Sequence, residues 1–265
     1  MTVHRYIPTD RCALVGMVHL LATPGSPGWS GSMPRLLARA REDAEQLVEG
    51  GCDALIIENM NDLPYLKGSV RPETAAAMTL AVDRVAGVGV PVGLQVLAGA
   101  NRQALGIAAA TPVSFLRVEA FAYGHLADEG WMDACAGELI RARAALGLEV
   151  AIWADVQKKH AAHAATADLT LSDLAHGAAF CLADVLIVTG RATGDPTARG
   201  DVDAARTAGL PVAVGSGVTP ENARTLAGAA HALIVGSALK RGGDWRAEVE
   251  VDRVRAVKAA MAAEA

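Results

Sequence analysis

The chain has 265 residues, 52% of them hydrophobic but only 4% aromatic, which is enough apolar side chain for a large aliphatic core. Its formal net charge is −5 and it has no Lys/Arg block, so we expect no nucleic-acid partner. No run reaches the roughly 18 consecutive apolar residues of a membrane span, so we expect no transmembrane segment.

Short β-rich runs alternate with helical segments along the chain. The expected strands are residues 13–18, 54–58, 92–96, 114–118, 150–155, 185–189, 212–216 and 232–236. The expected helices are residues 35–49, 73–85, 102–110, 131–146, 169–182, 202–208, 221–227 and 251–263. The strand segments are continuously apolar, which is typical of parallel strands buried on both faces.

This strict alternation predicts a single (β/α)8 TIM barrel of the phosphate-binding type, spanning residues 1–265. The alternative is an open, doubly wound sheet, which usually has fewer strands. Residues 1–11 form an N-terminal extension. Residues 21–34, with their repeated Pro and Gly, form a long loop after the first strand. That loop is either a lid over the barrel mouth or an ordinary surface loop.

Two Gly-Ser steps follow the last two strands, where barrels commonly bind phosphate. Glycine lets the backbone approach an anion closely, and a helix start after it supplies unpaired N–H groups. We therefore expect a phosphate cradle in which Lys240 adds a positive charge. The alternative is two tight turns without a ligand. The expected phosphate-binding residues are Gly215, Ser216, Gly217, Gly236, Ser237 and Lys240.

Other polar residues lie at or just after the ends of the earlier strands, where barrel enzymes place their catalytic groups. A carboxylate that ends an apolar strand is poorly solvated, which suits acid/base chemistry. The alternative is a structural carboxylate paired with Arg117 or a Lys in the barrel mouth. The expected catalytic residues are Asp155, Glu58, His19 and Lys159. The expected substrate-binding residues are Asn59, Gln95, Arg117, His160, Thr189 and Thr193.

The sequence predicts no cofactor and no metal site. His19 and His160 lack the spacing of metal ligands, and a divalent metal stays a weaker alternative. The four cysteines form no Cys-x-x-Cys pair and indicate core residues of a reduced protein rather than zinc ligands or disulfides.

Short motifs follow one another in order along the chain. They are GMVHL at 16–20 with PGSP at 24–27, IEN at 57–59, ADV at 154–156 with KHA at 159–161, IVTG at 187–190 with TG at 193–194, VGSGVT at 214–219, and VGS at 235–237 with Lys240. In this order they resemble the BtpA family, from about residue 12 to the end. Gln95, where Asn is common, and residues 119–125 depart from the family's pattern.

The resemblance implies a phosphate-binding TIM barrel. It also implies one of two functions. The family takes its name from a cyanobacterial protein needed for the accumulation of photosystem I reaction-centre proteins, whereas its SgcQ-like branch is associated with sugar metabolism and described as a nucleosidase or sugar-phosphate enzyme.

Three functions therefore stay open. The first is an enzyme that acts on a phosphorylated sugar or nucleoside-type metabolite by glycosidic cleavage, isomerisation or epimerisation. The second is a non-catalytic factor for the biogenesis or stability of a membrane complex such as photosystem I. The third is a ligand-binding regulator without chemistry. We expect a cytoplasmic protein, with peripheral membrane association and a homo-oligomer both left open.

Overall fold

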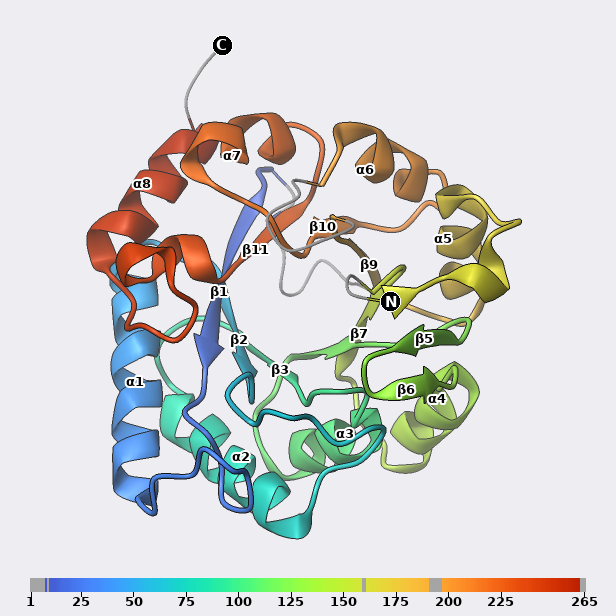
Figure 1. Ribbon diagram of the computed structural model, residues 1–265. Coiled ribbons are helices and arrows are strands. Elements are labelled where there is room, and N and C mark those ends of the chain that lie inside the picture. Colours follow the sequence, from blue (N-terminus) through green and yellow to red (C-terminus); the bar gives the residue numbers. More distant parts are fainter. Residues whose placement is uncertain (1–7, 9, 159–160, 191–196, 263–265) are drawn as a thin grey trace.

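A computed structural model describes residues 8, 10–158, 161–190 and 197–262. Eight parallel strands close into a barrel in the order β1-β11-β10-β9-β7-β4-β3-β2 (Figure 1). They are β1 (Ala13–His19), β2 (Ala54–Glu58), β3 (Val92–Gln95), β4 (Phe115–Val118), β7 (Ala151–Asp155), β9 (Val185–Val188), β10 (Val212–Val214) and β11 (Ala232–Val235). The predicted TIM barrel is confirmed, and every barrel strand overlaps its expected range.

An outer ring of helices covers the barrel (Figure 1). The helices are α1 (Met33–Glu49), α2 (Pro72–Val85), α3 (Asn101–Ala110), α4 (Ala136–Ala145), α5 (Leu171–Phe180), α6 (Arg199–Arg206), α7 (Pro220–Ala227) and α8 (Val251–Ala262). Short 3-10 helices occur at η2 (Ala164–Thr166), η3 (Ser237–Leu239) and η4 (Arg241–Gly243).

The expected helix over residues 131–146 is wrong at its beginning. Residues there form a hairpin of β5 (His125–Ala127) and β6 (Gly130–Met132), and β8 (Ala161–Ala162) pairs with β5 to make a small antiparallel sheet. Gly130 has a φ of +105°, which permits the tight reversal between the two hairpin strands. Helix α4 begins only at Ala136, after the hairpin.

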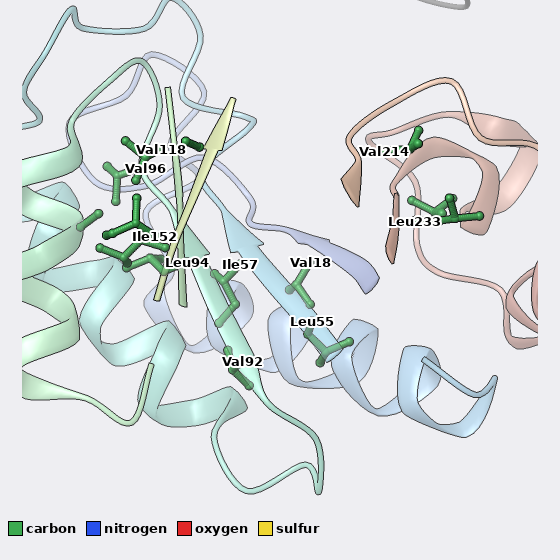
Figure 2. Close-up of a cluster of buried hydrophobic side chains, with 14 of the residues drawn as sticks. Val18, Leu55, Ile57, Val92, Leu94, Val96, Val118, Ile152, Val214 and Leu233 are labelled. Atoms are coloured by element: carbon green, nitrogen blue, oxygen red, sulfur yellow. The ribbon is translucent and has the colours of Figure 1, made fainter. Parts of the chain in front are cut away.

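The barrel has two separate apolar layers because successive strand residues point to opposite faces. One set faces outward onto the helices. Figure 2 shows this set as Val18, Leu55, Ile57, Val92, Leu94, Val96, Val118, Ile152, Val214 and Leu233. The other set fills the barrel interior, where Phe115 and Trp153 stack with ring centroids 4.2 Å apart. Gly93 makes room for Phe115, since a Cβ at position 93 would collide with its ring.

The loop at residues 21–34 packs against the protein. The Thr23 amide and hydroxyl donate to the two carboxylate oxygens of Asp62, each at 2.7 Å. Thr23 and Asp62 are both buried. Figure 1 shows this loop, in blue, at the rim of the barrel next to the start of α1. Of the two interpretations, the geometry favours an anchored rim loop over a lid across the mouth.

Candidate functional site

A layer of polar residues lies directly above the apolar interior of the barrel, at the carboxyl ends of the strands. Each interior side chain is followed two residues later by one that points the same way. Above the layer of Met17, Ile56, Gly93, Phe115, Trp153, Ile187, Ala213 and Ile234, these positions are His19, Glu58, Gln95, Arg117, Asp155, Thr189, Gly215 and Gly236. The fold therefore brings half of the expected site residues into one ring.

Arg117 and Asp155 form an ion pair inside this ring. Arg117 Nη2 lies 3.1 Å from Asp155 Oδ1, and its Nε lies 3.3 Å from both carboxylate oxygens. Burial alone would lower the pKa of the guanidinium, but the negative charges of Asp155 and Glu58 outweigh burial and raise it. Arg117 thus stays a fixed positive charge at the barrel mouth.

His19 has a defined tautomer. Its Nδ1 lies 3.0 Å from the carbonyl oxygen of Trp245, which can only accept a hydrogen bond, so Nδ1 carries the proton. In this tautomer of the neutral ring Nε2 carries no proton, and it lies 3.9 Å from Glu58 Oε2. The Trp245 ring meets the imidazole edge-on at 6.2 Å. Sequence reasoning missed Trp245, because its contribution is a backbone carbonyl from a distant loop.

Two of the eight ring positions are glycines, and we call the place where their missing side chains would lie the glycine gap. A Cβ at Gly215 would collide with Ile187 Cγ2 at 2.5 Å and would lie 3.3 Å from Arg117 Nη2. A Cβ at Gly236 would lie 3.2 Å from His19 Nε2. Any group bound against these glycines is therefore next to Arg117 and His19. An anion is the ligand that such neighbours favour.

Only some of the backbone amides around the two glycines donate hydrogen bonds within the described residues. Gly215 N donates to Val188 O at 2.8 Å, so this amide continues the strand ladder and does not face a ligand. In the part of the chain that the structure describes, no turn or loop hydrogen bond uses the amides of Ser216, Gly217, Gly236 or Ser237. The Ser216 hydroxyl is buried and has no partner among these residues. Four of the expected donors thus have no turn or loop partner among the described residues.

The loop after β10 has a side-chain bracket. Asn222 Oδ1 accepts from Thr219 N, and Asn222 Nδ2 donates to Gly217 O, each at 2.8 Å. The bracket joins the first turn of α7 to the Gly-Ser-Gly segment, which has Gly217 at a φ of +73°. The same Asn therefore begins the helix and shapes the loop.

The prediction for Lys240 is wrong. The side chain is completely buried, with Nζ 3.5 Å from Asp43 Oδ2 of α1. Burial lowers the pKa of Lys240, and Asp43 opposes that effect. The 3-10 helix η3 turns the chain after Gly236, so that Lys240 points between the barrel and α1 instead of toward the glycine gap. Lys240 is therefore a buried partner of Asp43 and does not line the glycine gap.

Asn59 and Thr189 make contacts within the protein. Asn59 is 1% exposed; its Nδ2 donates to Asp62 Oδ2 and its Oδ1 accepts from Leu97 N, both at 2.9 Å. The hydroxyl of Thr189 donates to Gln157 O at 3.0 Å. These bonds favour a positioning role for both residues. Lys159, His160 and Thr193 lie outside the described residues, and their expected roles stay predictions.

A second polar cluster beside the ring was not among the expected site residues. Lys158 Nζ lies 3.3 Å from Glu129 Oε2 of the hairpin and 3.8 Å from Glu119 Oε1, just after β4. Glu119 also accepts from Gly99 N at 2.8 Å. Burial raises the pKa of Glu119 to about 7, even though Lys158 acts in the opposite direction. Glu119 comes two residues after Arg117, so it continues the inward-facing positions of β4, and this spacing could have identified it from the sequence.

A small pocket separates Asp155 from the hairpin. It is lined by residues that include Asp155, Lys158, His125 and His163, and its volume of about 10 Å³ has room for roughly one water molecule. Burial lowers the pKa of His125 to about 4, helped by His163 and Lys158. Among the described residues, no group of three His, Cys, Asp or Glu side chains is arranged to hold a metal ion. None of the described helices is long and apolar enough to cross a membrane.

Comparison with known protein families gives a match to the BtpA family over residues 10–263. The chain is 39% identical over 255 residues to the photosystem I biogenesis protein BtpA of Synechocystis, covering 94% of this chain and 88% of the relative. It is 38% identical over 262 residues to an uncharacterized mitochondrial protein of Caenorhabditis elegans, covering 96% and 94%.

Solved structures with this fold include enzymes. Phosphoribosylanthranilate isomerase from Pyrococcus furiosus superposes with a TM-score of 0.56 at 12% identity, covering 94% of this chain and 98% of the isomerase. The protein named KGPDC from Streptococcus mutans gives a TM-score of 0.57 at 12% identity, covering 95% and 97%. At these identities the likeness establishes the barrel fold alone.

Proposed function

The chain belongs to the BtpA family, and on that premise we propose that it is an enzyme that acts on a phosphorylated small metabolite. The observation that carries the proposal is the polar ring with its glycine gap. A structural barrel has no need of six polar side chains in its uppermost interior layer, because burying them costs free energy. A layer of buried polar side chains is typical of a site that binds and transforms a ligand.

The phosphate group would bind at the carboxyl ends of β10 and β11. Among the described residues, four backbone amides there make no turn or loop hydrogen bond, and η3 begins directly after Gly236. Arg117 supplies a permanent positive charge and His19 supplies an N–H donor when protonated. This combination of backbone donors and nearby cations is what phosphate sites at the ends of barrel strands use.

Proton transfer would fall to Glu58 and His19. The two side chains are buried neighbours, and the fixed tautomer of His19 directs its unprotonated Nε2 toward Glu58 and the glycine gap. Asp155, held by Arg117, is better suited to orient the guanidinium or to stabilise developing positive charge. Isomerisation, epimerisation and cleavage of an N-glycosidic bond are the reaction classes compatible with this acid/base set.

A role in the biogenesis of a membrane complex is the second candidate, and it rests on the name of the Synechocystis relative. A comparably similar relative occurs in a nematode, which has no photosystem. This distribution favours a function that does not depend on photosystem I. The polar ring also has no use in a purely structural factor, so we place the enzymatic proposal first.

Phosphate binding can be tested by substituting a single glycine. In Gly236→Ala the new Cβ would lie 3.0 Å from His19 Cε1 and would fill the gap. We expect isothermal titration calorimetry to show that the affinity for inorganic phosphate falls at least about tenfold, which corresponds to 1.4 kcal/mol.

The matched control is Gly228→Ala at the end of α7, where φ is −70° and the nearest atom to a new Cβ is 3.6 Å away. This variant should bind phosphate like the wild type. Equal binding by Gly236→Ala and Gly228→Ala would remove the phosphate site from the glycine gap.

A further inference from the structure

Charge is unevenly distributed around the barrel mouth. Among the described residues, four carboxylates gather there, those of Glu58, Glu119, Glu129 and Asp155. The permanent cations in contact with them are Arg117 and Lys158. Glu119 is also subject to the charges of Asp155 and Glu58, so these carboxylates form one electrostatic group. When all of them are ionised, this group has an excess of negative charge.

Glu119 follows β4, across the mouth from the glycine gap, whereas Glu58 lies 3.9 Å from His19, next to that gap. In the closed strand order, β11 is four strands away from β4 in either direction, and β10 is four strands away from β3. Strands β10 and β11, which precede the two glycines, therefore lie across the barrel from β3 and β4, and Figure 1 shows β10 and β3 on opposite sides of the barrel. A ligand held by its phosphate at the glycines would extend toward Gln95, Glu119 and their acidic neighbours.

Gln95 is an independent sign of a ligand on this far side. It ends β3, in the interior register next to Glu58, and is 2% exposed. Its amide oxygen is buried and has no hydrogen-bond partner among the described residues. An unpaired buried acceptor is unfavourable, so Gln95 is expected to accept a hydrogen bond from a bound group.

We propose that the mouth selects a phosphate monoester whose other end carries hydroxyl or amino groups, and that it rejects a ligand with a second anionic group. Carboxylates and the Gln95 oxygen accept hydrogen bonds, so they match O–H and N–H donors. A second carboxylate or phosphate would lose its hydration beside like charges, which is unfavourable in a buried site. This inference rests on the proposed function and narrows its substrate class.

Three six-carbon phosphates test the proposal. Glucosamine 6-phosphate, glucose 6-phosphate and 6-phosphogluconate share the phosphate at C6 and differ in carrying an amino group at C2, only neutral hydroxyls, or a carboxylate at C1. In calorimetric titrations of the full chain at pH 8, we expect 6-phosphogluconate to bind at least about fivefold more weakly than glucose 6-phosphate. Glucosamine 6-phosphate should bind at least as tightly as glucose 6-phosphate. Any smaller difference, or the reverse order, would overturn the proposal.

Two variants assign the effect to residues. Gln95→Leu should weaken the binding of glucose 6-phosphate at least about fivefold and leave the affinity for inorganic phosphate unchanged. Glu119→Gln should reduce the difference in affinity between 6-phosphogluconate and glucose 6-phosphate. Gln103→Leu on α3 is the matched control, because the Gln103 amide oxygen is also buried without a partner among the described residues but lies in the outer helix ring. If neither Gln95→Leu nor Glu119→Gln differs from Gln103→Leu, the far side of the mouth is not the selecting surface.

Binding of inorganic phosphate distinguishes a failure of the proposed function from a failure of the proposed substrate class. If inorganic phosphate does not bind the wild-type protein, the proposed function fails. If it binds but the three six-carbon phosphates are not discriminated, only the substrate class proposed here fails.

Discussion

At the scale of single residues, neighbours in sequence have opposite surroundings because a strand alternates its faces. Glu58 belongs to the polar ring, whereas the next residue, Asn59, brackets Asp62 and Leu97 on the other side of β2. Lys240 is a second example. It follows β11 close in sequence to Gly236, but its side chain points into the core and contacts Asp43. In each case the residue type suggested a role in chemistry, but the direction in which the side chain points determined its actual contacts.

Glu119 provides a prediction about pH at this scale. Its pKa is raised from 4.5 in the unfolded chain to about 7 by burial, so the folded state binds the proton more tightly. Below about pH 4.5 this tighter binding contributes fully to stability, and the contribution is lost as pH rises through 7. The free energy of unfolding of the wild type, relative to Glu119→Gln, should therefore fall by about 1 to 3 kcal/mol between pH 5 and pH 8.

Urea unfolding of both proteins at the two pH values measures this difference, and effects of other titrating groups largely cancel in the comparison. A difference that is constant, or that grows with pH, would mean that Glu119 is ionised in the folded protein across this range.

At the scale of elements, short connections after the strands build the site. The loop from β10 to α7 is held by Asn222, and the chain after β11 passes through η3 and returns to place the Trp245 carbonyl on His19. The hairpin β5–β6 brings Glu129 to Lys158. These segments contain little regular structure, yet they set the tautomer and charge of the buried residues.

Asn222 carries the prediction at this scale. Asn222→Ala removes the acceptor for Thr219 N and the donor to Gly217 O, so it should destabilise the protein by roughly 1 kcal/mol and weaken phosphate binding. Thr170→Ala removes the N-cap of α5, with a similar expected loss of stability but no change in phosphate affinity. Denaturant unfolding and phosphate titration of both variants check this. Equal phosphate affinities would show that the bracket does not shape the binding loop.

At the scale of the whole molecule, the closed barrel depends on a packed interior below the polar ring. Gly93→Ala would force a Cβ into the Phe115 ring, which is stacked on Trp153 in the middle of the barrel. We expect a loss of about 1 to 3 kcal/mol in the free energy of unfolding, because overpacked cores relax poorly.

Gly106→Ala in α3 is the control, since its Cβ would have no atom within 4 Å and Ala is the better helix former. It should leave stability unchanged or raise it by up to about 1 kcal/mol. Denaturant unfolding of both variants gives the comparison, and a Gly93→Ala protein as stable as Gly106→Ala would show that the barrel interior adapts easily.

The sequence by itself determined the barrel, its eight parallel strands and the strand ends at which polar residues gather. It could do so because buried parallel strands and amphipathic helices leave local patterns of hydrophobicity. The tertiary structure alone decided that Lys240 is a core residue, that Glu119 and Lys158 stand beside Asp155, and that the Trp245 carbonyl fixes the His19 tautomer. These are contacts between residues far apart in the chain, and no local pattern of side chains encodes the distance or direction between them.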